Sequence, residues 1–452
     1  MVSLTLYGGA NEIGGNKILL EDKGVKLYLD FGQSFTFGED FFYEYLAPRT
    51  ANGLEVYFEF DMLPKIPALY GEDLLKLTDL KYQKPDVDAV IISHAHSDHV
   101  GHLEFLDKDI PLYMGHGAHK ITEIYHKLFP VLSNIGTHDN LHLFSSGDKF
   151  KVGHIEIEPI HVDHSIPGAY GFIIHTSKGP IIYTGDFRLH GPRADMSEEF
   201  ARKAAASKPK ALLCEGTRMG KEQEHNFTEA EVEKKAGDII AKSRGLVLAY
   251  FSMSNIDRFM CFYNAAKQNN RILVIDTRLA HIIENMKEKI KVLPDIRTDK
   301  NIAIYFRISK TCTYIAKDYA VWEREYMAKM VTSDVIAKNQ KRYVMHLGFY
   351  RLMELVYLQP KDADFIYSMS EHFLEGDDNE DQRKVWENWM AHFGITFHKA
   401  HSSGHASQDD IFSFIKQLNP KTTIPIHTNN AEDFAKSGAD IEIPKKGETI
   451  GI

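Results

Sequence analysis

The sequence predicts an α/β protein with two domains. Its 452 residues exceed what one ordinary hydrophobic core organises, so two domains are the natural expectation. Strand-like segments joined by short turns fill residues 1–33 and 86–186, as in a layered domain built on sheets. Between residues 220 and 395, helical patterns alternate with compact strand-like segments, which is typical of a parallel α/β domain.

The first informative element is an apolar segment, residues 86–92, followed by the run Ser93-His94-Ala95-His96-Ser97-Asp98-His99. We expect the segment to be a mostly buried strand, which places the run on the loop at its carboxyl end. Neutral imidazole and carboxylate are the ligands of zinc-class ions, so His94 and His96 would face one ion, and Asp98 and His99 a second. A polar loop that is merely rich in histidine does not account for four ligand-type residues at this spacing.

The H-x-H-x-D-H pattern resembles the metallo-β-lactamase superfamily, and later residues match its other motifs in order. His164 corresponds to the third motif, Asp186 to the carboxylate that bridges two metals, and Asp30 to an early aspartate that supports the site by hydrogen bonding. Taken alone, Asp30 or Asp186 would be a capping residue at a strand end. Their order and their placement after apolar strands favour the site instead.

Three further residues resemble motifs A, B and C of the β-CASP branch of this superfamily, which processes nucleic acids. They are Glu215 after the apolar segment 211–214, His405 in a Ser-Gly-His sequence, and His427. For Glu215 the alternative is a carboxylate that stabilises a helix N-terminus. Histidine at motif C is typical of the RNA-processing members, and the glycine-rich segment 8–16 resembles ribonuclease J. The chain departs from that family at Thr428, where glycine is usual.

The resemblance implies an αβ/βα metallo-β-lactamase sandwich of residues 1–217 and 396–452, with an inserted parallel α/β cap, the β-CASP domain, of residues 218–395. Within the cap we expect helices at 229–242 and 256–267 and strands at 245–251 and 271–276. After the cap we expect a helix at 408–417 and a strand ending at His427. These boundaries depend on sequence patterns, which locate element ends only to within several residues.

The implied function is a two-metal ribonuclease that hydrolyses phosphodiester bonds of single-stranded RNA, as a 5′–3′ exonuclease, an endonuclease or both. A hydroxide bridging the ions would be the nucleophile. The resemblance assigns His94, His96 and His164 to the first metal and Asp98, His99 and His427 to the second, with Asp186 between them. Asp98, His405 and Glu215 are the expected catalytic residues. The ions would be zinc, with manganese as the alternative. A DNA nuclease of the same fold and a non-catalytic scaffold for RNA processing are the competing hypotheses.

Two segments are expected to contact substrate phosphate. Ser403 and Gly404 precede His405, and the resemblance supports them. Ser252 and Asn255 lie where a predicted cap strand leads into a predicted helix, so they would bind phosphate at a helix N-terminus. Simple N-capping by Ser252 or Ser254 is an equally weighted alternative.

Composition agrees with this interpretation. The net charge of −10 argues against a broad basic surface for nucleic acid, although local clusters such as the one that includes Arg188 would line a groove or form a solvated helix face. The three cysteines form no C-x-x-C pair. No apolar run reaches the roughly 18 residues that span a bilayer, and the N-terminus lacks a signal pattern. We therefore expect a cytoplasmic protein without membrane binding, and the resemblance suggests a homodimer.

Overall fold

The computed structural model describes residues 2–35, 41–42, 46–129, 138, 140–220, 227–370, 374 and 380–452. The chain divides into two compact units, the first made of Met1–His225 and Gly404–Ile452 and the second of Asn226–Ser403. The boundaries expected from the sequence lie at residues 217 and 395. The predicted α/β class is confirmed, since both units combine helices with sheets. No helix in the described part of the chain is long and apolar enough to cross a membrane.

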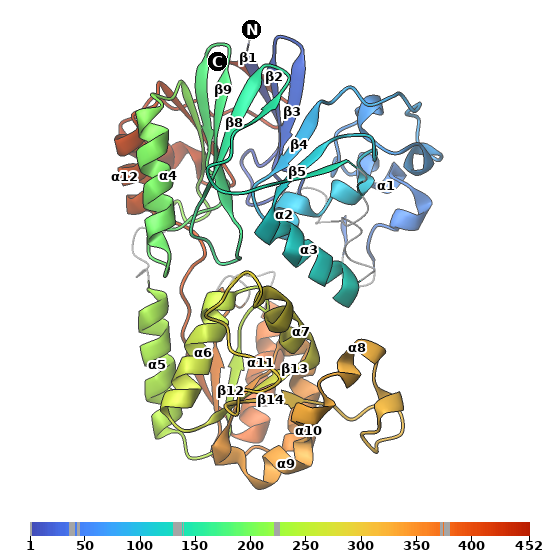
Figure 1. Ribbon diagram of the computed structural model, residues 1–452, viewed down its shortest axis with the longest axis vertical. Helices are drawn as coiled ribbons and strands as arrows, with labels where there is room; N and C mark the ends of the chain where they lie inside the picture. The colour runs from blue at the N-terminus through green and yellow to red at the C-terminus, as the bar shows by residue number, and fades with distance from the viewer. Residues whose placement is uncertain are drawn as a thin grey trace. The chain divides into compact units, whose positions relative to one another are not determined.

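The first unit contains two sheets (Figure 1). The strands of one, in spatial order, are β20 (Thr449–Gly451), β1 (Val2–Gly8), β2 (Lys17–Asp22), β3 (Val25–Leu29), β4 (Ala89–Ile92), β5 (Leu112–Gly115) and β6 (Leu141–Phe144). The strands of the other are β19 (Thr422–Ile426), β11 (Ala211–Glu215), β10 (Gly179–Tyr183), β9 (Tyr170–Thr176), β8 (Ile155–His161) and β7 (Phe150–Val152).

A shared hydrophobic core joins these two sheets into a sandwich. Leu4, Ile18 and Ile91 of the first sheet pack in one buried cluster with Phe172 and Leu213 of the second. Alternating residues of a strand point to opposite faces, so each sheet also presents an outer apolar face that needs covering.

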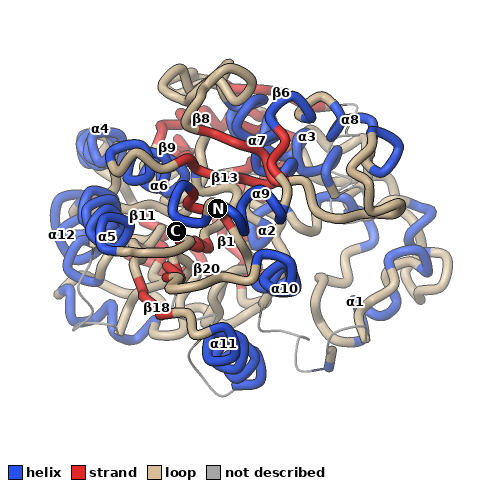
Figure 2. Tube along the Cα trace, turned by 90° about the horizontal axis from the view of Figure 1, so that it is seen from below, coloured by secondary structure: helices blue, strands red, loops and turns tan. Residues whose placement is uncertain are grey.

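Helices cover the outer face of the second sheet. Helices α4 (Ala194–Ala206) and α12 (Gln408–Leu418) lie side by side (Figures 1 and 2), and their apolar residues, among them Phe200 and Phe414, share a buried cluster with Ile182 and Leu212 of the sheet. The remaining α-helices of this unit are α1 (Glu55–Glu59), α2 (Ser97–Val100) and α3 (His116–Leu128). Because α12 begins directly after the segment of His405, its packing helps to fix that segment.

The strand directions place the carboxyl ends of several strands at one edge of the sandwich. β3, β4 and β5 are parallel to one another, as are β10, β11 and β19. Parallel strands bring their carboxyl ends to the same edge, which is where layered α/β folds build functional sites. Sequence-predicted site residues follow β3, β4, β10 and β19 and end β11, so this edge is the candidate site.

The second unit is a parallel sheet with helices. Its strands, in spatial order, are β15 (Met330–Val331), β14 (Ile302–Tyr305), β13 (Ile272–Asp276), β16 (Tyr343–His346), β12 (Val247–Tyr250), β17 (Asp364–Tyr367) and β18 (Thr396–Lys399). Its α-helices are α5 (Glu229–Lys242), α6 (Ile256–Gln268), α7 (Thr277–Met286), α8 (Val321–Arg324), α9 (Ser333–Lys338), α10 (Leu355–Leu358) and α11 (Glu380–Phe393).

Local sequence signals explain where these helices start. Thr228 and Glu231 form a capping box at the start of α5, in which each side chain satisfies a backbone N–H of the other residue. Asn255 caps α6 through its side-chain oxygen, which accepts a hydrogen bond from the Arg258 N–H. The predicted helices at 229–242 and 256–267 therefore form as α5 and α6, the second one residue longer.

Candidate metal centre

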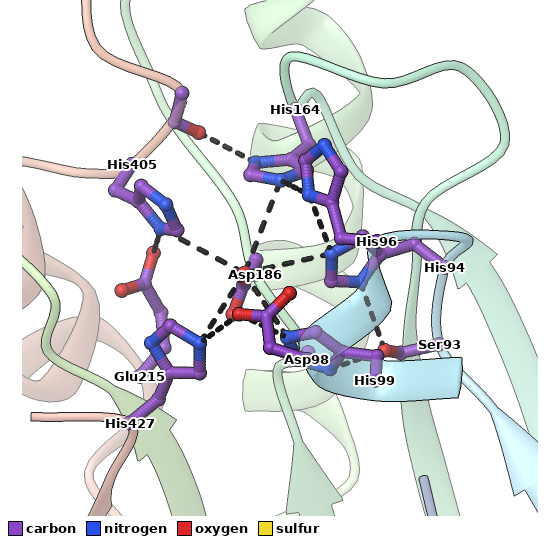
Figure 3. A network of polar contacts seen from close by, with 12 residues as sticks. Ser93, His94, His96, Asp98, His99, His164, Asp186, Glu215, His405 and His427 are labelled. Atoms are coloured by element: carbon purple, nitrogen blue, oxygen red, sulfur yellow. Dashed lines mark hydrogen bonds and ion pairs between the residues drawn. The ribbon is translucent and has the colours of Figure 1, made fainter. Parts of the chain in front are cut away.

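Six strands and the loop before α12 bring the predicted ligands together at the sandwich edge (Figure 3). The loop after β4 and the short helix α2 carry His94, His96, Asp98 and His99. The other residues of the centre follow or end strands elsewhere in the chain: Asp30 after β3, His164 after β8, Asp186 after β10, Glu215 at the end of β11, His405 before α12, and His427 after β19. In Figure 3 the side chains of the centre converge on Asp186.

One cluster consists of His94, His96, His164 and Asp186, whose ligand-type atoms lie within 4.8 Å of one another. The Nδ1 atom of His96 lies 3.1 Å from Nε2 of His94 and 3.1 Å from Nε2 of His164. The Oδ2 atom of Asp186 lies 3.5 Å from His94 Nε2 and 3.9 Å from His164 Nε2. Ligands of a tetrahedral zinc ion are about 3.3 Å apart, because each metal–ligand bond is about 2 Å long.

A second cluster consists of Asp98, His99, His427 and the same Asp186. Oδ2 of Asp98 lies 2.9 Å from Nε2 of His427 and 3.7 Å from Nε2 of His99. Oδ2 of Asp186 lies 3.2 Å from His99 Nε2 and 3.8 Å from His427 Nε2. A single carboxylate oxygen therefore belongs to both clusters, as a bridging ligand between two ions would.

Buried polar atoms without hydrogen-bond partners indicate whether these residues fit metal ions. Both side-chain oxygens of Asp186 and the Nε2 of His99 are buried and accept or donate no hydrogen bond. Leaving such groups unpaired in a protein interior costs free energy. Divalent cations would satisfy all three atoms at once, so the donor set fits a pair of metal ions.

The second nitrogen of each of three histidines is held by a neighbour. Nδ1 of His99 lies 2.6 Å from Oδ2 of Asp30, and Nδ1 of His164 donates to the backbone oxygen of Gly404 at 2.6 Å. Nδ1 of His94 lies 3.0 Å from the hydroxyl of Ser93. Such contacts fix the ring orientation and the tautomer, and they direct Nε2 toward the centre.

Asp30 is the anchor of this supporting network. It is fully buried, and it accepts hydrogen bonds from the backbone N–H and hydroxyl of Ser93, from His99 and from the hydroxyl of Tyr183. Asn16 in turn donates to the Tyr183 oxygen at 3.1 Å. These contacts place Asp30 in a supporting position rather than among the candidate ligands.

Glu215 connects two histidines of the centre. Its Oε1 lies 3.2 Å from Nδ1 of His405, and its Oε2 accepts hydrogen bonds from the backbone N–H and the hydroxyl of Thr217. The Thr217 hydroxyl lies 2.8 Å from Nδ1 of His427. Since this hydroxyl donates to Glu215, it accepts from His427 Nδ1–H, which leaves His427 Nε2 for a metal.

Glu215, His405 and Asp186 also form a third group of ligand-type residues within 4.8 Å. His405 Nδ1 lies 3.8 Å from Asp186 Oδ2. With 21% of its side chain exposed, His405 is more accessible than the fully buried side chains of His94, His99 and His164. A substrate can therefore reach His405 more easily than these three buried histidines.

The charges of the metal-free centre separate the histidines into two classes. Burial lowers the pKa of His94 and His164 well below the ordinary value, and it lowers the pKa of His96 to about 4. These three imidazoles are therefore neutral near pH 7, the form that binds metals. For His427, burial acts in the same direction, but Asp186 and the hydrogen bond to Asp98 outweigh it and raise the pKa to about 9.

The pKa of His99 is raised for the same reason as that of His427. Burial opposes its charged form, yet Asp186, Asp98 and Asp30 raise its pKa well above the ordinary value. Burial also opposes the ionised forms of Asp98 and Asp186, but the surrounding histidines hold the pKa of both carboxyls low. The carboxylates of the second cluster are therefore ionised and attract positive charge. Without metal ions, the protonated imidazoles of His99 and His427 supply that charge.

The backbone of the centre is tightly packed. Asp30 and His427 have positive φ angles of 58° and 53°, which are unusual for residues other than glycine. The His427 N–H bonds to the Gly9 oxygen at 2.8 Å, and a Cβ added to Gly32 would overlap the backbone oxygen of Asp98. Strained conformations persist where surrounding structure imposes them, typically at functional sites.

The residues predicted to bind phosphate have mixed outcomes. Gly404 lies at the centre, where its backbone oxygen holds His164, whereas Ser403 is the last residue of the second unit. Asn255 caps α6, so N-capping by Ser252 or Ser254 was the wrong alternative; these two hydroxyls lie 2.8 Å apart. Phosphate binding by Ser252, Asn255, Ser403 and Gly404 stays a prediction.

The interpretation of Arg188 as part of a groove or solvated face was wrong. Its side chain is fully buried, and Nε pairs with Oδ1 of Asp163 at 3.1 Å. A sequence pattern counts charges along the chain, but it does not reveal a buried carboxylate partner 25 residues away.

Four supporting residues have no place in the sequence prediction: Asn16, Ser93, Tyr183 and Thr217. For two of them a signal exists. Ser93 opens the histidine run, and Thr217 lies only two residues after Glu215, within reach of its side chain. Asn16 and Tyr183 approach Asp30 only through tertiary packing.

Two family models match parts of the chain. Residues 67–231 match a beta-lactamase superfamily domain, and residues 396–444 match a Zn-dependent metallo-hydrolase RNA specificity domain. The first match contains His94 to Glu215 of the centre, and the second contains His405 and His427.

The chain is similar to ribonuclease J of Sinorhizobium meliloti, with 28% identity over 48% of this chain and 39% of the relative. It is also similar to ribonuclease J of Helicobacter pylori, with 24% identity over 98% of this chain and 59% of the relative. The chain thus spans only part of these relatives' length. Ribonuclease J 2 of Streptococcus pyogenes is 22% identical over 99% of this chain and 75% of the relative.

A crystal structure of a protein of unknown function from Enterococcus faecalis has the same fold, with a TM-score of 0.76, 22% identity and 99% coverage of both chains. The domain matches, the relatives and the two-cluster centre agree with one another. The chain therefore contains a beta-lactamase superfamily domain and a Zn-dependent metallo-hydrolase RNA specificity domain and is similar to ribonuclease J, which is consistent with the ribonuclease J-like group of the β-CASP branch.

Proposed function

We propose that this protein is a metal-dependent ribonuclease that hydrolyses phosphodiester bonds of single-stranded RNA. The observation that carries the proposal is the shared Oδ2 of Asp186, which belongs to two clusters of buried ligand-type atoms. Two adjacent ions suit phosphodiester hydrolysis, since a phosphate presents several oxygens with developing charge.

His94, His96 and His164 would hold the first ion, Asp98, His99 and His427 the second, and Asp186 both. Zinc fits these nitrogen and carboxylate ligands, with manganese as the alternative. Ions held there would lower the pKa of a bound water, so that it could act as the nucleophile near neutral pH, and would supply positive charge for the phosphate. The buried carboxylates of Asp98 and Asp186 offset part of that positive charge within the protein.

His405 is the proposed acid that hands a proton to the departing oxygen. It is partly exposed, and Glu215 holds its Nδ1 at 3.2 Å, so Nε2 faces away from that carboxylate. Glu215 acts as a positioning residue, since its two oxygens orient His405 directly and His427 through Thr217. General acid catalysis contributes about 10²- to 10⁴-fold.

RNA is the proposed substrate because residues 396–444 match an RNA specificity domain and the similar proteins named above are ribonucleases. Histidine at position 427 supports the same choice through the family resemblance. A cytoplasmic location and a homodimer are also part of the proposal, and the homodimer follows from that resemblance alone.

The test is digestion of matched single-stranded RNA and DNA, each with a 5′ monophosphate, with metal present or chelated. We expect chelator-sensitive cleavage of RNA alone. Mononucleotide products would indicate a 5′ exonuclease, and internal fragments an endonuclease. Equal cleavage of DNA would favour the DNA nuclease, and no cleavage by the metal-loaded protein would favour the scaffold.

A matched pair of variants tests His405. His405→Ala should keep the metal content and lower kcat by about 10²- to 10⁴-fold, because only the proton donor is removed. His398→Ala is the control, since His398 pairs with Asp364 in the second unit and lies outside the centre. Loss of metal together with activity in His405→Ala would instead assign His405 to the metal site.

A further inference from the structure

The second unit contains a cavity of about 280 Å³ that the proposed mechanism does not use. It lies at the carboxyl ends of β12, β13, β14 and β16, which contribute Tyr250, Asp276, Tyr305 and His346 to its lining (Figure 1 labels β12 to β14). The volume is near the lower end of the range of about 300 to 1,000 Å³ for small-molecule sites. The space therefore suits one compact ligand.

The cavity coincides with the point where the strand order reverses. From β12 the chain proceeds through β13 and β14 to β15 on one side, and β17 and β18 lie on the other side of β12. β16 enters between β12 and β13. In open parallel sheets, ligands bind outside the carboxyl ends of the strands at such a reversal.

Arg351 offers an anion site in this lining. Its Nη2 donates to Oδ2 of Asp276 at 3.3 Å, and 26% of its side chain is exposed. Among the residues that the structure describes, the Arg351 side chain makes no other hydrogen bond. A guanidinium has five N–H donors in a fork that matches phosphate, so Asp276 holds the group while most donors stay available.

The acidic residues of the lining limit how much negative charge the cavity accepts. Asp276 also caps α7 by accepting from the Leu279 N–H at 2.8 Å, and Glu354 accepts a hydrogen bond from the hydroxyl of Tyr305. Two carboxylates thus balance Arg278 and Arg351. A single phosphate suits this balance better than a polyphosphate does.

Tyr350 supplies an aromatic surface beside Arg351. Its side chain is 89% exposed, the largest exposed fraction among the described large hydrophobic residues, and it lines the cavity. Exposed aromatic rings stack on the bases of single-stranded nucleic acids, which have no partner strand to cover them. Met253 and Met369 add adaptable apolar lining.

We propose that this cavity binds one nucleotide unit of single-stranded RNA, with its phosphate on Arg351 and its base on Tyr350. The identity of the ligand as RNA rests on the proposed function. A free nucleoside 5′-monophosphate presents the same phosphate and base as one unit of RNA. The experiment therefore tests both RNA and free nucleotides.

The experiment measures binding of a fluorescently labelled single-stranded RNA to the full chain by anisotropy, with metals chelated so that no cleavage occurs. Arg351→Ala and Tyr350→Ala should each weaken binding by about tenfold. Arg351→Ala should also lower the slope of log affinity against log salt by about 0.7, because one phosphate contact is lost, whereas Tyr350→Ala should leave the slope unchanged.

The controls are Arg342→Ala and Tyr357→Ala, which remove exposed side chains of the same unit outside the cavity and should bind RNA like the wild type. Thermal melting of each variant checks folding. Wild-type affinity for RNA in both cavity variants would overturn the cavity proposal alone, provided that the wild type cleaves RNA.

Two other outcomes are also decisive. Adenosine or uridine 5′-monophosphate binding that depends on Arg351, with RNA affinity unchanged, would assign the cavity to free nucleotides and overturn the RNA proposal. A wild type that neither binds nor cleaves RNA would overturn the proposed function together with this site.

Discussion

At the scale of single residues, the centre depends on side chains that are not themselves candidate metal ligands. Asp30 receives hydrogen bonds from Ser93, His99 and Tyr183 and carries the only carboxylate that fixes the His99 tautomer through Nδ1 among the described residues. The quality of the metal site therefore depends on a residue outside the two clusters.

Replacing Asp30 by Asn should lower metal affinity by about 10- to 100-fold, because the amide presents N–H groups where the carboxylate accepts hydrogen bonds. Competitive titration with a metal-sensitive dye measures the change. Asp86→Asn is the control, since the Asp86 side chain is 74% exposed and pairs with Lys26, which is not part of the centre. Wild-type affinity in Asp30→Asn would contradict the anchoring role.

Thr217→Val should weaken binding at the second cluster by about tenfold and leave the first unchanged, because the hydroxyl links Glu215 only to His427. Metal content after dialysis against a range of free zinc separates the two affinities. Thr217→Ser keeps the hydroxyl and should behave like the wild type. If the serine variant were as weak as the valine variant, packing of the methyl group, not the hydrogen bonds, would be responsible.

At the scale of elements, the join between β3 and α2 is the tightest contact of the centre. Gly32 follows β3, and a side chain there would overlap the backbone of Asp98 in α2. The Phe31 N–H also bonds to the His99 oxygen at 3.0 Å. The loop of metal ligands is thus held against the first sheet by its backbone.

Gly32→Ala should displace Asp98 and His99 and reduce metal content. Gly451→Ala is the matched control, because nothing lies within 4 Å of an added Cβ there and its φ is not positive. Metal analysis and melting temperature report the two effects. Unchanged metal content in Gly32→Ala would mean that α2 shifts without disturbing its ligands.

Several elements were predictable from the sequence because their signals are local. The histidine run follows β4 as expected, and α5 has its predicted bounds because the Thr228–Glu231 capping box marks its start. The cap of α6 was misassigned, since Ser252, Ser254 and Asn255 are all good capping residues and only backbone geometry selects among them. Arg188 was misplaced because its partner Asp163 is remote in sequence.

At the scale of the whole molecule, the fold class and the convergence of the ligands follow from motif order along parallel strands. The supporting contacts of Asn16 and Tyr183 with Asp30 could not be predicted, because they depend on how two sheets face each other across the core. The cavity of the second unit likewise follows from strand order, which no local pattern specifies.

Metal binding should strengthen as the pH rises from about 6.5 to about 9. The pKa of His427 is raised to about 9 in the metal-free protein, so an ion must displace a proton below that pH. Protonated His427 stabilises the metal-free fold fully below its unfolded pKa of about 6.5, and this contribution disappears as the pH rises through about 9. The gain in Tm on adding zinc should therefore be larger at about pH 8.5 than at about pH 6.5.

Comparing metal-free and metal-loaded protein at each pH isolates this effect. Burial also lowers the pKa of Lys17 to about 7, which makes stability rise with pH, but that contribution is the same with and without metal. The pKa of His96, at about 4, lies below the window. An equal gain in Tm at both pH values would contradict the proton displacement.

The closure of the first unit by its last strands has a consequence for protein synthesis. His405 and His427 follow the second unit in the sequence, and the His427 N–H bonds to the backbone oxygen of Gly9, which precedes that unit. A ribosome completes the N-terminal ligands long before it reaches His427, so the second cluster cannot assemble before the whole of the second unit has been synthesised. For a ribonuclease, this order of assembly would keep the protein inactive until His427 has been synthesised.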